Sequence, residues 1–179
     1  MESAVSALDG VSIEVVVGNI VEQPDFDAIV NAANAELMPG GGVAGAIHRA
    51  AGPGLAEECR PLAPIRPGEA VITGGHQLPN PHVIHCLGPV YGVDHPEADL
   101  LAACYRNSLE LADENDLESV AFPAISTGAF GYPMEEAADV ALSTVLETAG
   151  NLETVRRVRF VLTDDSTRRL HQQILDRLT

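Results

Sequence analysis

The feature that most constrains this chain is an apolar run that passes through a glycine-rich turn into a helical pattern. Residues 28–30 (Ala-Ile-Val) predict a short buried strand, and apolar side chains recur at helical spacing over residues 43–51. Gly40, Gly41 and Gly42 lie between them. Such a turn presents free backbone N–H groups and the positive end of a helix dipole, which together bind anions, usually phosphates. Because neither a P-loop nor a GxGxxG fingerprint is present, a flexible surface loop is the alternative for this segment taken alone.

A second segment repeats this order of strand, glycine-rich loop and helix. Its loop runs from Ser126 to Gly131, and Pro133 suits the first turn of the helix Met134–Ala149. The hydroxyls of Ser126 and Thr127 and the nearby N–H groups form a second potential phosphate cradle. Loops that follow parallel strands lie side by side at the carboxyl edge of a sheet, where open α/β folds bind ligands. One loop suits a phosphate, whereas two suggest a pyrophosphate held between two ribose or base pockets.

The remaining pattern alternates strands with helices, which indicates an α/β protein with a mostly parallel sheet and helices on both faces. No internal repeat and no long linker divides the chain, so we expect one domain over residues 1–179. The predicted strands are 12–17, 28–33, 69–74, 82–87, 118–122 and 155–162, and the predicted helices are 43–51, 54–62, 97–114, 134–149 and a last one capped by residues 163–166 and ending at 178.

Composition narrows the class of protein. The chain has 179 residues, 46% of them hydrophobic, and no apolar run approaches the length of a membrane span. Its first residues lack the basic region and apolar core of a signal peptide, so we expect a cytoplasmic location. We also expect the protein to be a monomer. Cys59, Cys86 and Cys104 form no CxxC pair, which favours buried thiols.

A metal centre is not expected. His76, His82 and His85 fall around one strand and one turn, but no cysteine or carboxylate joins them at a ligand spacing. We expect neither a metal nor another cofactor.

The charge is strongly acidic. The formal net charge is −16, and all ten basic residues are arginine. Such a surface disfavours nucleic acid and anionic membranes as partners. It suits a salt-rich cytoplasm, so we interpret the chain as halophilic. An acidic mesophilic protein from a GC-rich genome is the alternative, since such genomes favour arginine over lysine.

Several motifs occur in order along the chain: Gly18–Ile20, Asp27–Asn34, Gly40–Val43, Gly45–His48, Val83–His85, Gly88–Tyr91 and Phe122–Gly128. Together they resemble the macrodomain family of ADP-ribose-binding modules. The resemblance runs from Gly18 to the end of the chain and is closest to hydrolases that remove ADP-ribose from protein side chains or deacetylate O-acetyl-ADP-ribose. It implies a three-layer α/β/α sandwich, with an extra strand near the N-terminus and ADP-ribose as the ligand.

Asn34 is the first candidate for chemistry. Its amide offers donors and an acceptor to adjacent ribose hydroxyls. The alternative is that Asn34 only ends the strand and caps a turn. The resemblance implies that Asn34 orients the distal ribose, where the scissile bond lies, and that Asn31 braces the loop. It also implies a wider set of ligand contacts: Asn19, Ile20, Ala33, Asn34, Gly40, Gly41, Gly42, Val43, Ser126, Thr127, Gly128, Ala129, Phe130 and Gly131.

Ala44 is the main departure from the family pattern. The hydrolase subgroup typically has an aspartate there that helps to activate water, and alanine cannot accept a proton. Other macrodomains with alanine either bind only or stay active with help attributed to the ligand's own pyrophosphate; an engineered inactivation is a further explanation. His48, one turn along the helix, is a candidate base, although packing against the loop is the alternative. Glu36 and the pair Asp94–His95 are weaker candidates.

Two further departures concern the adenine. Asn19 stands where the family usually has aspartate, yet its carbonyl oxygen can still accept from the adenine amino group. Residues 162–164 (Leu-Thr-Asp) lack the aromatic that often stacks on adenine, so the affinity for adenine is lower or another side chain covers the ring. Phe130 is placed to wall the distal ribose, with core packing as the alternative.

The function expected from this resemblance is hydrolysis of ADP-ribosyl esters, with ADP-ribosylated acidic side chains or O-acetyl-ADP-ribose as the substrate. The partners are therefore ADP-ribose or an ADP-ribosylated protein. A non-catalytic ADP-ribose reader is one alternative, and a phosphatase acting on ADP-ribose 1″-phosphate is another.

The acidic composition predicts a salt response. Relief of self-repulsion should raise the thermal unfolding midpoint as salt increases from low to molar concentration, since the Debye length falls to about 3 Å at 1 M. Thermal melts across a salt series check this. A midpoint that stays flat or falls would remove the halophilic interpretation.

Overall fold

The computed structural model describes residues 5–179, and seven strands and five α-helices make up most of it. The strands are β1 (Val5–Leu8), β2 (Val11–Val17), β3 (Ala28–Ala32), β4 (Ala70–Gly74), β5 (His82–Cys86), β6 (Ser119–Phe122) and β7 (Arg157–Leu162). The helices are α1 (Gly42–Ala51), α2 (Gly54–Cys59), α3 (Glu97–Glu114), α4 (Met134–Ala149) and α5 (Asp165–Leu178).

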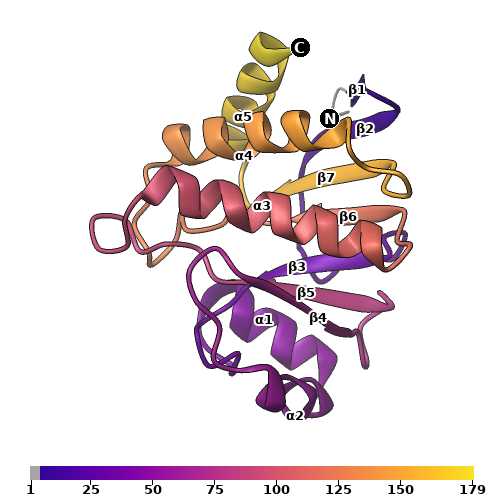
Figure 1. Ribbon diagram of the computed structural model, residues 1–179, viewed down its shortest axis with the longest axis vertical. Coiled ribbons are helices and arrows are strands. Elements are labelled where there is room, and N and C mark those ends of the chain that lie inside the picture. The colour runs from indigo at the N-terminus through magenta and orange to yellow at the C-terminus, as the bar shows by residue number, and fades with distance from the viewer. Residues whose placement is uncertain (1–4) are drawn as a thin grey trace.

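All seven strands join in one sheet in the order β1-β2-β7-β6-β3-β5-β4 (Figure 1). The five inner strands are parallel, whereas β1 and β4 run antiparallel to their neighbours at the two edges. β1 is the added N-terminal strand that the resemblance implied. The predicted strand over residues 69–74 is therefore an antiparallel edge strand of a mixed sheet.

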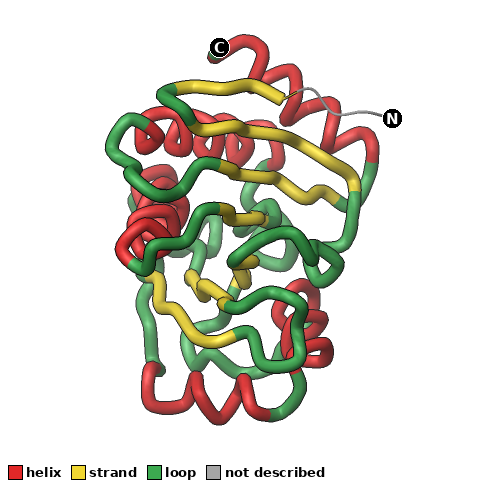
Figure 2. Tube along the Cα trace, turned by 90° about the vertical axis from the view of Figure 1, so that its right-hand side faces the viewer, coloured by secondary structure: helices red, strands yellow, loops and turns green. Residues whose placement is uncertain are grey.

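Alternation along the strands sends side chains into two cores. In β7, for example, Val158 and Phe160 enter the larger core, and Val161 enters the smaller one. α3, α4 and α5 cover the face of the sheet that bears the larger core, while α1 and α2 cover the opposite face, which bears the smaller core (Figures 1 and 2). In the larger core the rings of Phe122 and Phe160 stack with their centroids 5.8 Å apart. The predicted three-layer α/β/α sandwich is confirmed.

Two predicted boundaries were wrong for local reasons. The helix expected over residues 54–62 divides into α2 and a 3₁₀ turn, Arg60–Leu62, where Pro61 lacks the N–H that an α-helical bond requires. The last strand begins at Arg157 rather than Val155, because the Asp113 carboxylate binds the backbone N–H groups of residues 153–155 at 2.7–3.1 Å. The bounds of α3 and α4 agree with the prediction.

A buried polar cluster lies on the α1/α2 side of the sheet. Asn31 Nδ2 donates to His85 Nδ1 at 3.1 Å, and His85 Nε2 lies 2.9 Å from the Thr73 hydroxyl and 3.7 Å from Cys59 Sγ. This network fits a neutral His85 that accepts at Nδ1 and donates at Nε2. Burial, with a smaller contribution from the charge of nearby His48, lowers the pKa of His85 from 6.5 to about 3. Asn31 thus ties β3 to β5 rather than bracing the following loop.

The three cysteines lie in the two cores, Cys59 in the smaller and Cys86 and Cys104 in the larger. Cys59, Cys86 and Cys104 are free and buried, as predicted, and burial followed by the charge of Glu58 raises the pKa of Cys59 to about 11. Within residues 5–179, no group of three or more His, Cys, Asp or Glu side chains is arranged to hold a metal ion. No helix in that range is long and apolar enough to cross a membrane.

His85 predicts a stability that depends on pH. Its pKa is lower in the folded protein than in the unfolded chain, so the unfolded chain binds more protons once the pH falls below 6.5. The free energy of unfolding should fall by about 1.4 kcal/mol per pH unit for each such histidine on going from about pH 6 to about pH 5. Urea titrations check this. His85→Gln should show a shallower slope than the parent over this range; equal slopes for the two proteins would contradict the assignment.

Candidate ligand-binding cleft

A cleft with two lobes lies at the carboxyl edge of the inner strands. The smaller lobe has a volume of about 340 Å³ and lies between the loops that follow β3 and β6. The larger lobe has a volume of about 660 Å³ and reaches the ends of β2 and β7. Gly42, Val43, Ala124 and Gly128 line both lobes, so these residues form the junction between them.

The first loop brings backbone donors to this junction. Gly41 is the N-cap of α1, and no side chain caps this end of the helix. The N–H groups of Gly42, Val43 and Ala44 belong to the first turn, where no preceding helical carbonyl can accept from them. The loop lies close against its own helix: a Cβ on Gly45 would collide with the carbonyl oxygen of Gly40, so this contact requires glycine.

The second loop contributes in the same way, but not through its hydroxyls. The Ser126 hydroxyl donates to the Pro89 carbonyl at 2.9 Å, and the Thr127 hydroxyl donates to the Ala124 carbonyl at 2.8 Å. Both hydroxyl protons are therefore in use within the protein. In the described chain, the N–H groups of Gly128, Ala129 and Phe130 have no protein acceptor. Backbone amides are thus the donors that this loop can offer to a ligand.

The structure brings nearly all of the predicted contact residues to the cleft. Gly131 is the exception, because it lines neither lobe. Its φ is +74°, and its N–H donates to the Gly128 carbonyl at 3.0 Å, so it closes the turn behind the cleft. The smaller lobe holds Ala33, Asn34, Gly40, Gly41, Ser126, Ala129 and Phe130; the larger holds Asn19, Ile20 and Thr127; and Gly42, Val43 and Gly128 belong to both.

Asn34 closes a turn and also lines the smaller lobe. Its side chain donates to the Met38 carbonyl at 2.8 Å and accepts from the Met38 N–H at 3.0 Å, which closes the turn between residues 34 and 38. The same side chain lines the smaller lobe. Because an amide can make four hydrogen bonds, one N–H and one lone pair remain for a ligand.

Among residues 5–179, no carboxylate lies in the wall of the smaller lobe. Ala44 lines it, at 5% exposure, and none of the other lining residues is an aspartate, a glutamate or a histidine. His48 is not in either lobe: it is buried, its ring nitrogens have no partner in the described chain, and burial lowers its pKa. The weaker candidates Glu36, Asp94 and His95 also lie outside the lining.

Sequence reasoning missed part of the larger lobe. Met134, Val161 and Thr167 line it, together with Ile20 and Leu162. Met134 is the first residue of α4, and Val161 points to the α1/α2 side of the sheet by strand alternation. The pairing of β2 with β7 would have indicated this part of the lobe, because it places Val161 beside Val16, near the start of the Gly18–Ile20 segment.

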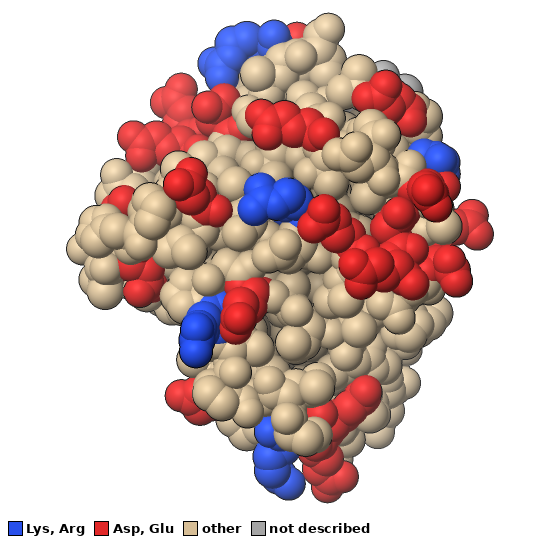
Figure 3. All heavy atoms as spheres, viewed as in Figure 1, with Lys and Arg blue, Asp and Glu red and all other residues tan. Residues whose placement is uncertain are grey.

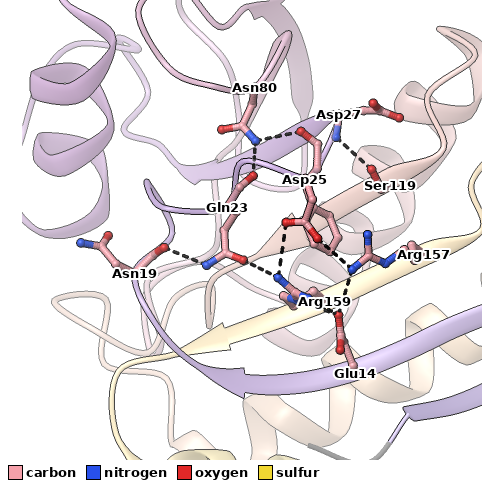
Figure 4. A network of polar contacts seen from close by, with 10 residues as sticks. Glu14, Asn19, Gln23, Asp25, Asp27, Asn80, Ser119, Arg157 and Arg159 are labelled. Atoms are coloured by element: carbon pink, nitrogen blue, oxygen red, sulfur yellow. Dashed lines mark hydrogen bonds and ion pairs between the residues drawn. The ribbon is translucent and has the colours of Figure 1, made fainter. Parts of the chain in front are cut away.

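A polar network holds the loop that carries Asn19 (Figure 4). Gln23, only 5% exposed, donates through Nε2 to the Asn19 carbonyl at 2.9 Å, and its Oε1 accepts from Arg159 at 2.8 Å. Glu14 binds Arg159 Nε and so fixes that guanidinium from the other side. The chain of contacts therefore runs from β2 through β7 to the edge of the larger lobe.

Phe26 anchors the same loop on the sheet. The guanidinium groups of Arg157 and Arg159 each lie 4.5 Å from the centre of the Phe26 ring. Asn80 donates to the Gln23 and Phe26 carbonyls at 2.7 and 2.8 Å. These contacts cover the part of the sheet near β2 and β7 that α1 and α2 do not reach.

Comparisons with known proteins agree with this geometry. Residues 30–141 match the family model described as Macro domain. The chain is 48% identical to an O-acetyl-ADP-ribose deacetylase of Klebsiella pneumoniae over 90% of this chain and 95% of that protein. It is 53% identical to a Macro domain-containing protein of Chlorobaculum tepidum, over 83% and 87% of the two chains. The chain belongs to the Macro domain family.

Solved structures give the same result. A variant of the Oceanobacillus iheyensis macrodomain, solved with ADPR, superposes with a TM-score of 0.93 at 39% identity and covers 99% of this chain and 98% of that one. The Trypanosoma brucei macrodomain in complex with ADP-ribose has a TM-score of 0.84 at 36% identity, over 90% and 68% of the two chains.

The Gln23 contacts predict a selective loss of affinity. Gln23→Ala removes the bridge between Arg159 and Asn19, so the Asn19 loop should loosen and AMP should bind about three- to tenfold more weakly, the effect of one to two lost hydrogen bonds. Calorimetry with AMP measures this. The exposed-site control Gln173→Ala should bind AMP as the parent does. Unchanged AMP affinity in a folded Gln23→Ala variant would contradict the assigned role.

Proposed function

We propose that this chain binds ADP-ribose across both lobes and hydrolyses ADP-ribosyl esters, either ADP-ribosylated acidic side chains or O-acetyl-ADP-ribose. The observation that carries this proposal is the pair of loops at the junction. Each presents backbone N–H groups that have no acceptor in the part of the chain that the structure describes, and the larger and smaller lobes lie on either side of them. The proposal assigns the pyrophosphate to the junction, the adenosine to the larger lobe and the distal ribose to the smaller lobe.

The charge of the cleft explains why backbone donors matter. Of the described residues that line the two lobes, none is an arginine, and the chain carries a formal net charge of −16. A ligand with two phosphates must therefore be held by N–H groups and by the dipole of α1. The acidic surface further supports the proposal of a salt-adapted protein, since salt screens the repulsion between the chain and its anionic ligand.

In the larger lobe, aliphatic side chains are proposed to replace the stacking aromatic. Ile20, Met134 and Val161 provide an apolar wall, and the flexible thioether of methionine adapts well to a planar ring. Asn19 lies at the same lobe, and its Oδ1 already accepts from the Val21 N–H at 3.2 Å. A second lone pair on this oxygen remains for the adenine amino group.

Hydrolysis in the smaller lobe requires an activated water. Water adds across the ester C–O bond, so that its hydroxyl and its proton end on the two products, ADP-ribose and a carboxylic acid. We assign to Asn34 the orientation of the distal ribose. Because Ala44 provides no base, the proton acceptor in this proposal is a pyrophosphate oxygen of the ligand itself. The deacetylase named among the relatives supports an ester as the substrate.

A second candidate function is a reader that binds ADP-ribose without turnover. The absence of any carboxylate among the residues that line the smaller lobe favours it. Assays with mono-ADP-ribosylated protein and with O-acetyl-ADP-ribose at high salt, beside calorimetry with ADP-ribose, separate the two: binding with turnover supports the hydrolase, and binding alone supports the reader.

Ala44→Asp should accelerate turnover. A carboxylate at the start of α1 lies at the favourable end of the dipole and should be tolerated by the fold. General-base assistance is worth about 10²–10⁴-fold, so the gain in kcat should be plain, with a somewhat weaker affinity for ADP-ribose because two negative groups approach.

Ala44→Asn is the matched control, because it has nearly the same shape as aspartate but accepts no proton at neutral pH. It should not reproduce the gain. If Ala44→Asp leaves the rate of an active parent unchanged, the water is activated by another group. If the parent and Ala44→Asp both bind ADP-ribose and neither hydrolyses an ADP-ribosyl ester, the protein is a reader of ADP-ribose.

A further inference from the structure

The loop between β5 and α3 projects from the molecule beside the smaller lobe and carries unusual apolar exposure. Val93 is 68% exposed and Tyr91 is 39% exposed, and Val93 is the most exposed of the large hydrophobic side chains in the described chain. Figure 1 shows this loop extending away from the sheet, next to the start of α4. We use the term tip surface for Tyr91, Val93 and the two carboxylates that flank them, Glu97 and Glu136.

Hydrogen bonds within the loop and to the start of α3 stabilise its conformation. Val90 N–H donates to the Asp94 carboxylate at 2.8 Å, and Asp94 N–H donates back to the Val90 carbonyl at 2.9 Å. Gly92 N–H donates to the Glu97 carboxylate at 3.1 Å. The backbone polar groups are thus paired inside the loop, while the side chain of Val93 faces solvent. An ordered loop loses little conformational entropy when a partner binds it.

The tip surface is continuous with the wall of the smaller lobe. Tyr91 N–H donates to the Phe130 carbonyl at 2.9 Å, and Phe130 lines that lobe. The Tyr91 ring packs on Tyr132, with centroids 4.9 Å apart. Phe130 thus connects the lobe to the tip surface, and we expect a polypeptide attached to a distal ribose in the smaller lobe to lie beside that surface. An acetyl group is too small to reach it.

The flanking charges indicate the chemistry of the partner. Glu136 accepts from the Tyr91 hydroxyl at 3.3 Å, and the Gly92 N–H, together with His95, holds the pKa of Glu97 below its usual value. Both carboxylates lie in the first turns of helices, where the helix dipole also favours a negative charge. They nevertheless leave a negative rim around an apolar centre, which suits basic and apolar side chains. Figure 3 shows the projecting region at the left edge of the molecule, mostly tan with red atoms nearby.

We propose that the tip surface docks the polypeptide of an ADP-ribosylated protein, through an apolar residue with arginine or lysine beside the modified side chain. This inference rests on the proposed function, because it needs the distal ribose in the smaller lobe. It selects a protein, rather than O-acetyl-ADP-ribose, as the substrate for which the chain is adapted.

Affinity measurements test it without requiring turnover. The probes are free ADP-ribose and two short peptides that are ADP-ribosylated on a glutamate, one with leucine and arginine beside it and one with serine and glutamate. The parent should bind the first peptide more tightly than free ADP-ribose. Val93→Ser should remove about tenfold of that affinity, the effect of one buried aliphatic side chain, and leave the affinity for ADP-ribose unchanged.

Leu178→Ser is the matched control, since Leu178 is 40% exposed and is the last residue of α5. The C-terminal end of α5 lies away from the loop between β5 and α3 (Figure 1). The control variant should bind all three probes as the parent does. Equal binding of the first peptide and free ADP-ribose by the parent, equal binding of the two peptides, or loss of ADP-ribose affinity in Val93→Ser would each overturn the proposal. If the parent prefers the first peptide but releases no ADP-ribose from it, only the hydrolase function is overturned. If the parent binds no ADP-ribose, the proposed function and the docking proposal are both overturned.

Discussion

The parallel alignment of β3, β6 and β7 is the constraint on which the rest of the cleft depends. It ends these strands at one edge of the sheet, so that loops far apart in the sequence meet there. The first turn of α1 and the loop before α4 then place unpartnered N–H groups at the same junction. These donors are part of the main chain, so a change of side chain removes them only if it moves the loop. Binding of an anion here depends on the fold itself more than on any single side chain.

The side chains around the junction mainly hold the loops in place. The Ser126 and Thr127 hydroxyls bind carbonyls of their own region, and Asn34 closes a turn while it lines the smaller lobe. At the larger lobe, Gln23 is held by Arg159 and in turn holds Asn19. A protein with a net charge of −16 gains from this arrangement, because an uncharged amide attracts phosphate at short range without an arginine in the cleft.

Much of the fold and the position of the cleft could be predicted from local pattern. The bounds of α3 followed from apolar periodicity, and those of α4 from Pro133 and Gly150 at its ends. Both glycine-rich loops were recognised from the strand and helix around them. The resemblance supplied the ligand. The network around Arg159 could not be predicted, because it joins residues more than a hundred positions apart. The burial of His48, the Met134 wall and the internal use of two hydroxyls likewise depend on tertiary packing.

Calorimetry with ADP-ribose, AMP and ribose 5-phosphate, at one high salt concentration, tests the central claim most directly. In the proposed binding mode, the larger lobe holds the adenosine, the smaller lobe holds the distal ribose, and the pyrophosphate lies at the junction between them. ADP-ribose should therefore bind more tightly than AMP, and AMP more tightly than ribose 5-phosphate. Equal affinity for ADP-ribose and AMP would contradict a pyrophosphate that spans the two loops.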